Sequence, residues 1–371
     1  MSDFVQLHIL TGYPPANLNR DDLGSPKTVI VGGTNRLRIS SQSLKRAWRT
    51  SDVFKEALDG GVGVRTREMG VRIYDALTNG TTLGEAMEGK TSGDLATLPE
   101  TEATKIAESM VKSFASLAKP SKEEQEAEGK KRASLKTGQL VHYGPKEIHS
   151  MAELVERTRK GEKIGDSDLA LLRKDHAAAD IAMFGRMLAD KPGGNVEAAV
   201  QVSHAFTVQK VAVEDDFFSA VDDLNKAAEE TGAGHLGVNM FGAGLFYLYV
   251  CIDRGLLAEN LVGDKTLATR AIKALTRAAL TVAPTGKQAS YASRAYAAYV
   301  LAEKGDEQPR SLAVSFLQPV PPGDMFSWSV NVLETVKTNM DKVYGLNPAG
   351  YRMDAINGKG TLEELLAFVT E

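Results

Sequence analysis

Two kinds of hydrophobic pattern follow one another along the 371-residue chain, and their order restricts the fold more than any other feature. Near the N-terminus and again beyond residue 180, apolar residues alternate or form short runs, as in FVQLHIL and GLFYLYVCID. Such segments predict β-strands. Between them, residues 60–178 are rich in Ala, Glu, Lys, Thr and Gly. The expected helices of this middle region lie near 102–118, 150–160 and 166–178. The order predicts an α+β chain that carries a mostly helical insertion.

Shorter segments complete this prediction. The segment TVIVGGTNRLRI indicates two extended stretches around a glycine turn, and a helix should run from Ser40 or Ser41 to about Leu58. Residues 119–138 are highly charged and predict a loop. The other expected elements are a long strand or hairpin arm at 197–213, strands at 296–304 and 312–317, and helices at 266–282 and 326–345.

The cysteine content and the N-terminal sequence indicate a cytoplasmic protein. Cys251 is the single cysteine, so no intramolecular disulfide can form, which fits a reducing compartment. The N-terminus lacks the basic start of a signal peptide. No run of about 18 apolar residues occurs, so we expect no membrane span.

Positive charge is concentrated in one short part of an acidic chain. Residues 20–49 contain seven Lys and Arg residues but only two acids, although the whole chain has a net charge of −4. The seven cations are Arg20, Lys27, Arg36, Arg38, Lys45, Arg46 and Arg49. Such an asymmetry predicts an anionic partner at this place.

The segment SQSLKRAWR has two different faces when it is placed on a helix. Leu44, Ala47 and Trp48 cluster on one side. Gln42, Lys45, Arg46 and Arg49 lie on the opposite side. Lys45 and Arg49 are four residues apart and repel each other, so a counter-charge from outside the helix is expected.

The start of this helix also suits an anion. Ser40 and Ser41 are good N-cap residues, which would place backbone N–H groups beside Arg36 and Arg38 of the preceding strand. A phosphate fits such a place. The alternative is a solvated basic helix whose cations pair with acids elsewhere in the chain, and the spacing does not decide between these two interpretations.

The same region resembles a known family. LNRDDLGSPKTVIVGGTNRLRISSQSLKRAWR is similar to the N-terminal signature of CasC-type subunits, which form the backbone of type I-E CRISPR surveillance complexes (Cascade). DIAMFGRM, DDFFSAVDDL and GHLGVNMFGAGLFYLYVCID support the resemblance in the expected order. It is strong over residues 1–50 and 180–253 and faint over 60–178.

The resemblance implies a hand-like fold. An RRM-like (ferredoxin-like) palm would comprise residues 1–59 and 180–371, with a helical fingers domain inserted at 60–179 and a thumb β-hairpin at 198–236. Several copies would stack along one CRISPR RNA as a helical filament. Each copy would grip the RNA backbone and kink out a base at regular intervals, leaving the other bases to pair with target DNA in antiviral defence. The implied partners are CRISPR RNA, target DNA, further copies of the chain, and the large, small, end-capping and RNA-processing Cascade subunits.

The resemblance also assigns candidate residues. Those expected at the RNA backbone are Arg20, Lys27, Ser40, Gln42, Lys45 and Arg49, where Arg49 replaces an expected lysine. Arg38 and Arg46 join them because of their positions in the basic segment. Met187, Phe218 and Leu236 fall where the family wedges its kinked base, with the hydrophobic core as their alternative role. Family lysines that attract target DNA have no matched positions in this sequence.

No enzymatic motif stands out, and we expect neither catalysis nor a cofactor. The six histidines form no metal-binding pair, and P-loop, Rossmann and GxSxG patterns are absent. Asp21 and Asp22 could hold Mg²⁺, which leaves a metal-dependent ribonuclease as one alternative function. Ordering of the loop by this pair is favoured. A general single-stranded RNA-binding protein is the other alternative.

Overall fold

The computed structural model describes residues 3–220 and 235–371, which divide into two compact units. Unit 1 comprises Met1–Ala57, Val200–Gly255 and Thr269–Glu371, and unit 2 comprises Leu58–Ala199 and Leu256–Ala268. The predicted insertion, 60–179, falls within unit 2, which also takes in residues on both sides of the 200–255 segment. Strands predominate in unit 1 and helices in unit 2, so the predicted α+β class is confirmed.

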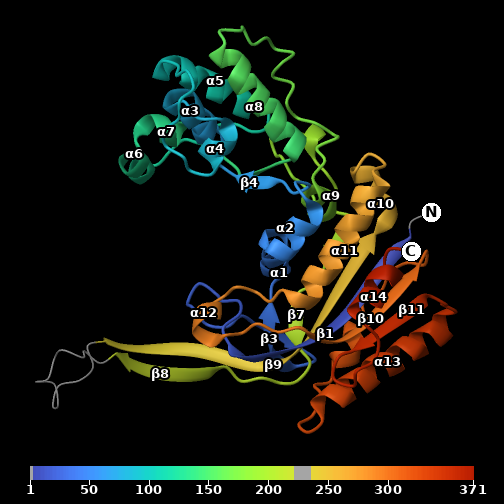
Figure 1. Ribbon diagram of the computed structural model, residues 1–371. Helices are drawn as coiled ribbons and strands as arrows, with labels where there is room; N and C mark the ends of the chain where they lie inside the picture. Colours follow the sequence, from blue (N-terminus) through green and yellow to red (C-terminus); the bar gives the residue numbers. More distant parts are fainter. Residues whose placement is uncertain (1–2, 221–234) are drawn as a thin grey trace, which may run out of the picture. The chain divides into compact units, whose positions relative to one another are not determined.

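Unit 1 is built on an antiparallel sheet (Figure 1). Its main path runs in the order β11-β10-β1-β9-β7-β3-β2, and β6 and β8 also pair with β9. The strands are β1 (Phe4–Ala16), β2 (Thr28–Val31), β3 (Thr34–Ile39), β6 (Val200–Val202), β7 (Ala205–Thr207), β8 (Glu214–Ala220), β9 (His235–Asp253), β10 (Ala297–Gly305) and β11 (Ala349–Asp354).

Strand β1 lies in the interior of the sheet, between β9 and β10. Val5, Leu7 and Ile9 are fully buried on one face of the strand, and His8 and Leu10 are fully buried on the other. Leu10 belongs to a hydrophobic cluster with side chains of β9, β10 and helix α13 (Met325–Tyr344). The predicted opening strand is therefore confirmed, and it extends further than expected.

The predicted helix at residues 40–58 is two helices, α1 (Ser41–Thr50) and α2 (Asp52–Leu58). Ser51 has an extended backbone between them. Its hydroxyl donates to the Trp48 carbonyl at 2.7 Å and accepts from the Phe54 N–H at 3.3 Å. A serine that caps both helix ends in this way explains the break, which the hydrophobic spacing did not reveal. The other helices with unit 1 residues are α10 (Arg254–Asn260), α11 (Lys265–Thr281), α12 (Gln288–Tyr291), α13 and α14 (Leu362–Phe368).

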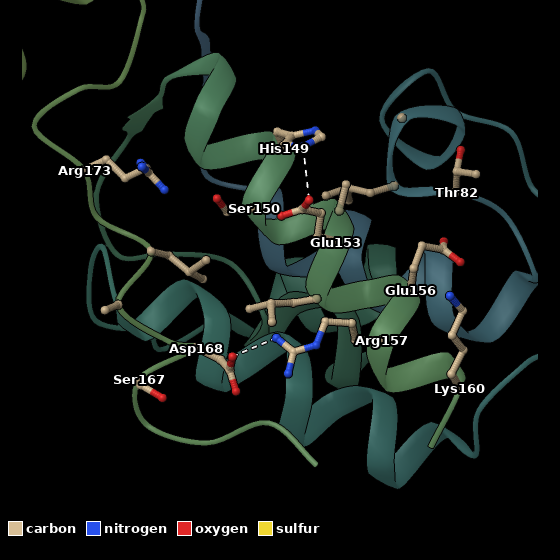
Figure 2. Close-up of a pocket in the computed structure, with 16 residues that line it drawn as sticks. Thr82, His149, Ser150, Glu153, Glu156, Arg157, Lys160, Ser167, Asp168 and Arg173 are labelled. Carbon is tan, nitrogen blue, oxygen red and sulfur yellow. Dashed lines mark hydrogen bonds and ion pairs between the residues drawn. The ribbon is translucent and has the colours of Figure 1, made fainter. Parts of the chain in front are cut away.

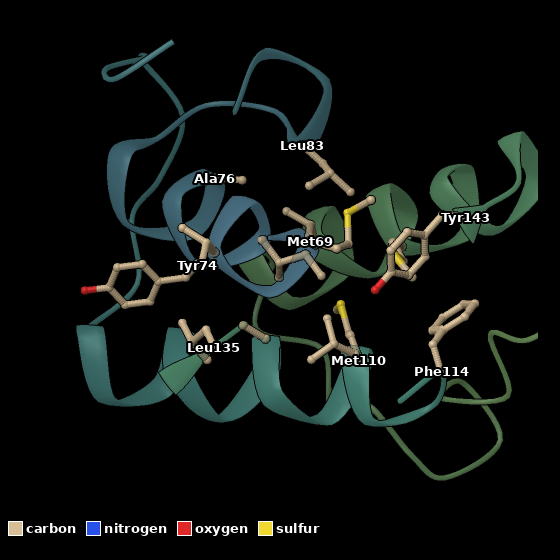
Figure 3. Close-up of a cluster of buried hydrophobic side chains, with 14 of the residues drawn as sticks. Met69, Tyr74, Ala76, Leu83, Met110, Phe114, Leu135 and Tyr143 are labelled. Carbon is tan, nitrogen blue, oxygen red and sulfur yellow. The ribbon is translucent and has the colours of Figure 1, made fainter. Parts of the chain in front are cut away.

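Unit 2 packs its helices around a separate hydrophobic core. Met69, Phe114 and Tyr143 lie in this cluster, where the Phe114 and Tyr143 rings meet edge to face with centroids 4.9 Å apart (Figure 3). The elements are β4 (Val64–Thr66), α3 (Met69–Asn79), α4 (Leu83–Met87), α5 (Glu100–Lys112), α6 (Lys122–Glu128), α7 (Lys130–Ser134), β5 (Val141–Tyr143), α8 (Pro145–Arg159) and α9 (Ala179–Phe184).

Four local predictions are wrong. The charged segment 119–138 contains α6 and α7, because Ser121 and Glu124 form a capping box and Arg132 pairs with the buried Asp75. Residues 166–178 are not helical, although Leu171 is buried. The long strand expected at 197–213 is reduced to the short β6 and β7, and the strand expected at 312–317 is a 3₁₀ turn, Ala313–Phe316.

Within residues 3–220 and 235–371, no helix combines the length and the apolar character that crossing a membrane requires.

Gly32 and Gly33 form the tight turn of the β2–β3 hairpin, with φ of 56° and 76°. A Cβ on Gly32 would lie 1.6 Å from the Leu317 carbonyl oxygen, whereas one on Gly33 would have open space. We therefore expect Gly33→Ala to cost about 1 kcal/mol from the positive φ alone, and Gly32→Ala to cost roughly 2 kcal/mol more. Denaturant unfolding of the two variants measures the difference, and equal losses would contradict the close approach.

Candidate nucleic-acid interface

Helix α1 presents the two faces that its sequence predicts. Leu44, Ala47 and Trp48 are buried, and Trp48 is only 1% exposed. On the other side Gln42 and Arg46 are exposed, while Lys45 and Arg49 are half-buried. Burial lowers the pKa of Lys45 below its ordinary value, because desolvation disfavours the charged form. The buried face anchors the helix to unit 1, and the cationic side chains lie on the opposite face.

A loop between β1 and β2 lies directly beside the start of α1. The Asn19 side-chain oxygen accepts the Ser40 N–H at 2.8 Å, and the Lys27 carbonyl accepts the Arg38 N–H at 2.8 Å. Asn17 fixes the loop to β9 by donating to the Met240 carbonyl at 2.9 Å. These bonds bring the loop that carries Arg20 and Lys27 next to the segment that carries Arg38 and Ser40. Asn19 is a positioning residue that charge patterning did not single out.

Asp21 orders the tip of this loop. Its Oδ1 accepts the backbone N–H groups of Leu23 at 3.0 Å and Ser25 at 2.9 Å. Arg20 and Asp22 are exposed. Arg20, Asp21, Asp22, Ser43 and Gly286 are among the residues that line a cleft of about 480 Å³ beside α1. The cleft lies between the loop and the helix, and its volume can hold a polar ligand group.

Arg36 does not face this cleft, and the prediction that it lies beside a bound phosphate is wrong. Its side chain is fully buried. Its guanidinium donates to the carbonyls of Thr207 at 3.0 Å and Phe316 at 3.2 Å, and to the Thr34 hydroxyl at 2.9 Å. Its hydrogen bonds to backbone carbonyls hold separate segments of unit 1 together, which is a structural role.

The N-terminal N–H groups of α1 are also less available than expected. The Ser40 hydroxyl, part of a buried residue, accepts the Ser43 N–H at 3.3 Å. The Ser41 N–H donates to His204 Nδ1 at 3.0 Å, and Arg38 Nη1 lies 3.4 Å from the same nitrogen. Burial, followed by the charges of Arg38 and Lys27, lowers the pKa of His204, which keeps the ring neutral near pH 7. An anion here would therefore contact mainly side chains.

The three candidate base-contacting residues occupy different places. Met187 lies in unit 2 and is 78% exposed. Phe218 lies in β8, is 37% exposed, and its ring covers Gly237 of β9. Leu236 pairs with Ser219 through its backbone, but its side chain lies outside the described residues, as do residues 221–234 of the predicted thumb.

The β8–β9 hairpin also exposes an aromatic residue that is not among the sequence-predicted candidates. Phe217 is 67% exposed and pairs with Val238, which is 57% exposed. Directly opposed residues in an antiparallel pair share a face, so these two form an apolar surface on the side of the hairpin away from Phe218. Phe217 directly precedes the candidate Phe218 in the sequence, and this position could have identified it as a second aromatic candidate.

Unit 2 has a hollow of about 730 Å³ along α8, lined by both acidic and basic groups (Figure 2). Arg157 donates to Asp168 at 2.7 Å, and His149 lies 3.3 Å from Glu153. Lys160 also lines the hollow. Because its charges are mixed and largely paired, the hollow supports no phosphate site.

Among the residues that the structure describes, no group of three His, Cys, Asp or Glu side chains lies together to hold a metal ion.

Comparisons with known proteins cover nearly the whole chain. A family model described as CT1975-like protein matches residues 5–365. A solved structure described as "CRISPR RNA-guided surveillance complex, pre-nicking" is 28% identical, with a TM-score of 0.80 and 99% of both chains covered. A second, described as "CRISPR RNA-guided surveillance complex", is 24% identical with a TM-score of 0.57 and the same coverage, and it shows the fold alone. No curated protein matches the sequence.

Proposed function

The chain belongs to the CT1975-like protein family, and from this we propose that it is the backbone subunit of a CRISPR RNA-guided surveillance complex. The family assignment agrees with the resemblance carried by residues 1–50 and 180–253. The observation that carries the proposed role is the cationic face of α1, which the Asn19–Ser40 hydrogen bond joins to the loop bearing Arg20 and Lys27. A surface of clustered cations on a rigid support suits a phosphate backbone of any sequence.

In this proposal the parts of the chain have different tasks. The sheet of unit 1 is the RRM-like palm, unit 2 is the fingers domain, and the β8–β9 hairpin is the thumb. The α1 face and its loop grip the RNA backbone. Exposed Met187 and partly exposed Phe218 wedge unstacked bases, because thioether and aromatic groups contact a base face without reading its identity. Copies of the chain polymerise along the guide RNA and join the other Cascade subunits, and guide bases then pair with target DNA.

We further propose that the subunit is not catalytic. Asp21, one of the two metal-binding candidates, uses one carboxylate oxygen to accept two backbone N–H groups. This contact gives it a loop-ordering role that needs no metal.

The experiment that tests the proposed function is purification of the tagged chain from its native host, followed by sequencing of the RNA that accompanies it. The expected result is short RNA of uniform length, with constant ends and variable middles. Mixed cellular RNA would instead support a general RNA-binding protein. Recovery without RNA would support a basic face that is neutralised within the chain itself.

A further inference from the structure

Met187 is an exposed residue between two buried neighbours. It is 78% exposed, while its neighbours Arg186 and Leu188 are 5% and 0% exposed. The two buried neighbours fix the backbone on both sides of this large apolar side chain. An ordinary surface methionine in a flexible loop has no such support. The arrangement indicates that the chain presents Met187 in a defined place.

The Arg186 side chain is the main anchor of this segment. Its Nη1 lies 2.7 Å from Oε2 and 3.0 Å from Oε1 of Glu147, and these two side chains are only 1% and 0% exposed. Arg186 Nη1 also donates to the His142 carbonyl at 3.1 Å, and Nε donates to the Gly194 carbonyl at 3.0 Å. One guanidinium therefore ties the segment to α8, to β5 and to the turn at 192–194.

The backbone on both sides of Met187 is fixed as well. Arg186 and Val196 exchange two backbone hydrogen bonds, of 3.0 and 2.9 Å. The Leu188 N–H donates to the Asn195 side-chain oxygen at 2.6 Å. Met187 thus has hydrogen-bonded residues immediately before and after it, which restrain the position of its Cα.

We propose that Arg186 is a positioning residue that holds Met187 ready to separate two stacked bases of a bound RNA strand. This inference rests on the proposed function. A buried ion pair is a poor source of stability, because desolvation offsets much of its attraction. The ion pair between Arg186 and Glu147 instead fixes the position of the exposed Met187 before RNA binds. This lowers the conformational entropy that is lost on binding.

The test uses the full chain and single-stranded RNA in which each base in turn is replaced by the fluorescent base 2-aminopurine, which brightens when it is unstacked. Wild-type protein should brighten the wedged positions several-fold, and Met187→Ala should abolish this signal at the base that Met187 contacts. Arg186→Lys keeps the positive charge but removes the planar guanidinium that binds several acceptors at once. This variant should lower the fluorescence signal at least threefold, while its total RNA affinity should change less than threefold. The double variant should lose no more than Met187→Ala alone.

A second variant covers the case in which Arg186→Lys does not fold. Asn195→Ala removes only the acceptor for the Leu188 N–H, at an exposed residue, and should lower the signal in the same way. Arg157→Lys changes a partly exposed ion pair elsewhere in unit 2 and is the matched control. This variant should leave the fluorescence signal unchanged. Normal fluorescence with both Arg186→Lys and Asn195→Ala would overturn the positioning role. Normal fluorescence with Met187→Ala would instead overturn the proposed wedge.

Discussion

Reversing the charge of Lys45 and Arg49 to glutamate is expected to lower the affinity for single-stranded RNA by about 100-fold or more at physiological salt. Both residues lie on the cationic face of α1, opposite the buried Trp48. The change would remove the two proposed phosphate contacts and add two repulsive charges. Because Leu44, Ala47 and Trp48 remain in place, the helix should stay docked and the fold should be retained.

The measurement is RNA binding at several salt concentrations, together with assembly of copies along the RNA. The slope of log affinity against log salt should fall by about two, one for each lost contact. Lys342→Glu with Lys359→Glu is the matched control, since these exposed cations of unit 1 lie outside the α1 face and its loop. Wild-type assembly by the α1 variant would contradict the phosphate grip, as would an equal loss in the control.

The features that sequence predicted best are those that short-range spacing determines. Leu44, Ala47 and Trp48 recur at helical spacing, so their burial and the outward cationic face followed directly. The β2–β3 hairpin was equally accessible because two adjacent glycines mark the turn.

The features that sequence missed depend on partners distant in the chain. Arg36 looked like a ligand-binding cation, but the carbonyls that surround it come from Thr207 and Phe316, more than 170 residues away. His204 occupies the first N–H of α1 from a similar distance. Asn195, which fixes the turn at Met187, belongs to a segment without periodic pattern. The sequence shows which residues are polar and which share a face of a helix, but only the fold decides whether a carbonyl or solvent faces them.

A second large effect is expected in the core of unit 1, where the Glu303 carboxylate is fully buried. It accepts from His8 Nε2 at 3.1 Å and from Arg310 Nη1 at 3.1 Å and Nη2 at 3.0 Å. His8 Nδ1 in turn lies 3.0 Å from the Tyr247 hydroxyl, and burial lowers the pKa of His8, so the neutral ring accepts from Tyr247 and donates to Glu303. Strands β1, β9 and β10 are therefore joined by a chain of hydrogen bonds that runs from Tyr247 through His8 to the Glu303 carboxylate.

Replacing Glu303 by glutamine should lower the free energy of unfolding by about 3 kcal/mol, because His8 and Arg310 lose a buried anionic acceptor. Arg310 keeps its second carboxylate partner, Asp341, at 2.6 Å, which limits the loss. The amide has nearly the same volume, so no cavity contributes to this loss. Glu307→Gln is the matched control. It makes the same substitution four residues later at an exposed position, and should change stability by less than about 0.5 kcal/mol.

The pH dependence of stability distinguishes a charge effect from a packing effect. Burial alone would raise the pKa of Glu303, but hydrogen bonds from His8 and Arg310 outweigh it and lower the pKa to about 2, against 4.5 for an ordinary glutamate. A carboxylate whose pKa is lower in the folded state stabilises fully above pH 4.5 and loses that contribution as pH falls toward 2. Urea unfolding of wild type and Glu303→Gln between pH 7 and 2 should therefore converge below pH 4.5. A difference that stayed constant down to pH 2 would show that packing, and not the carboxylate charge, accounts for the loss.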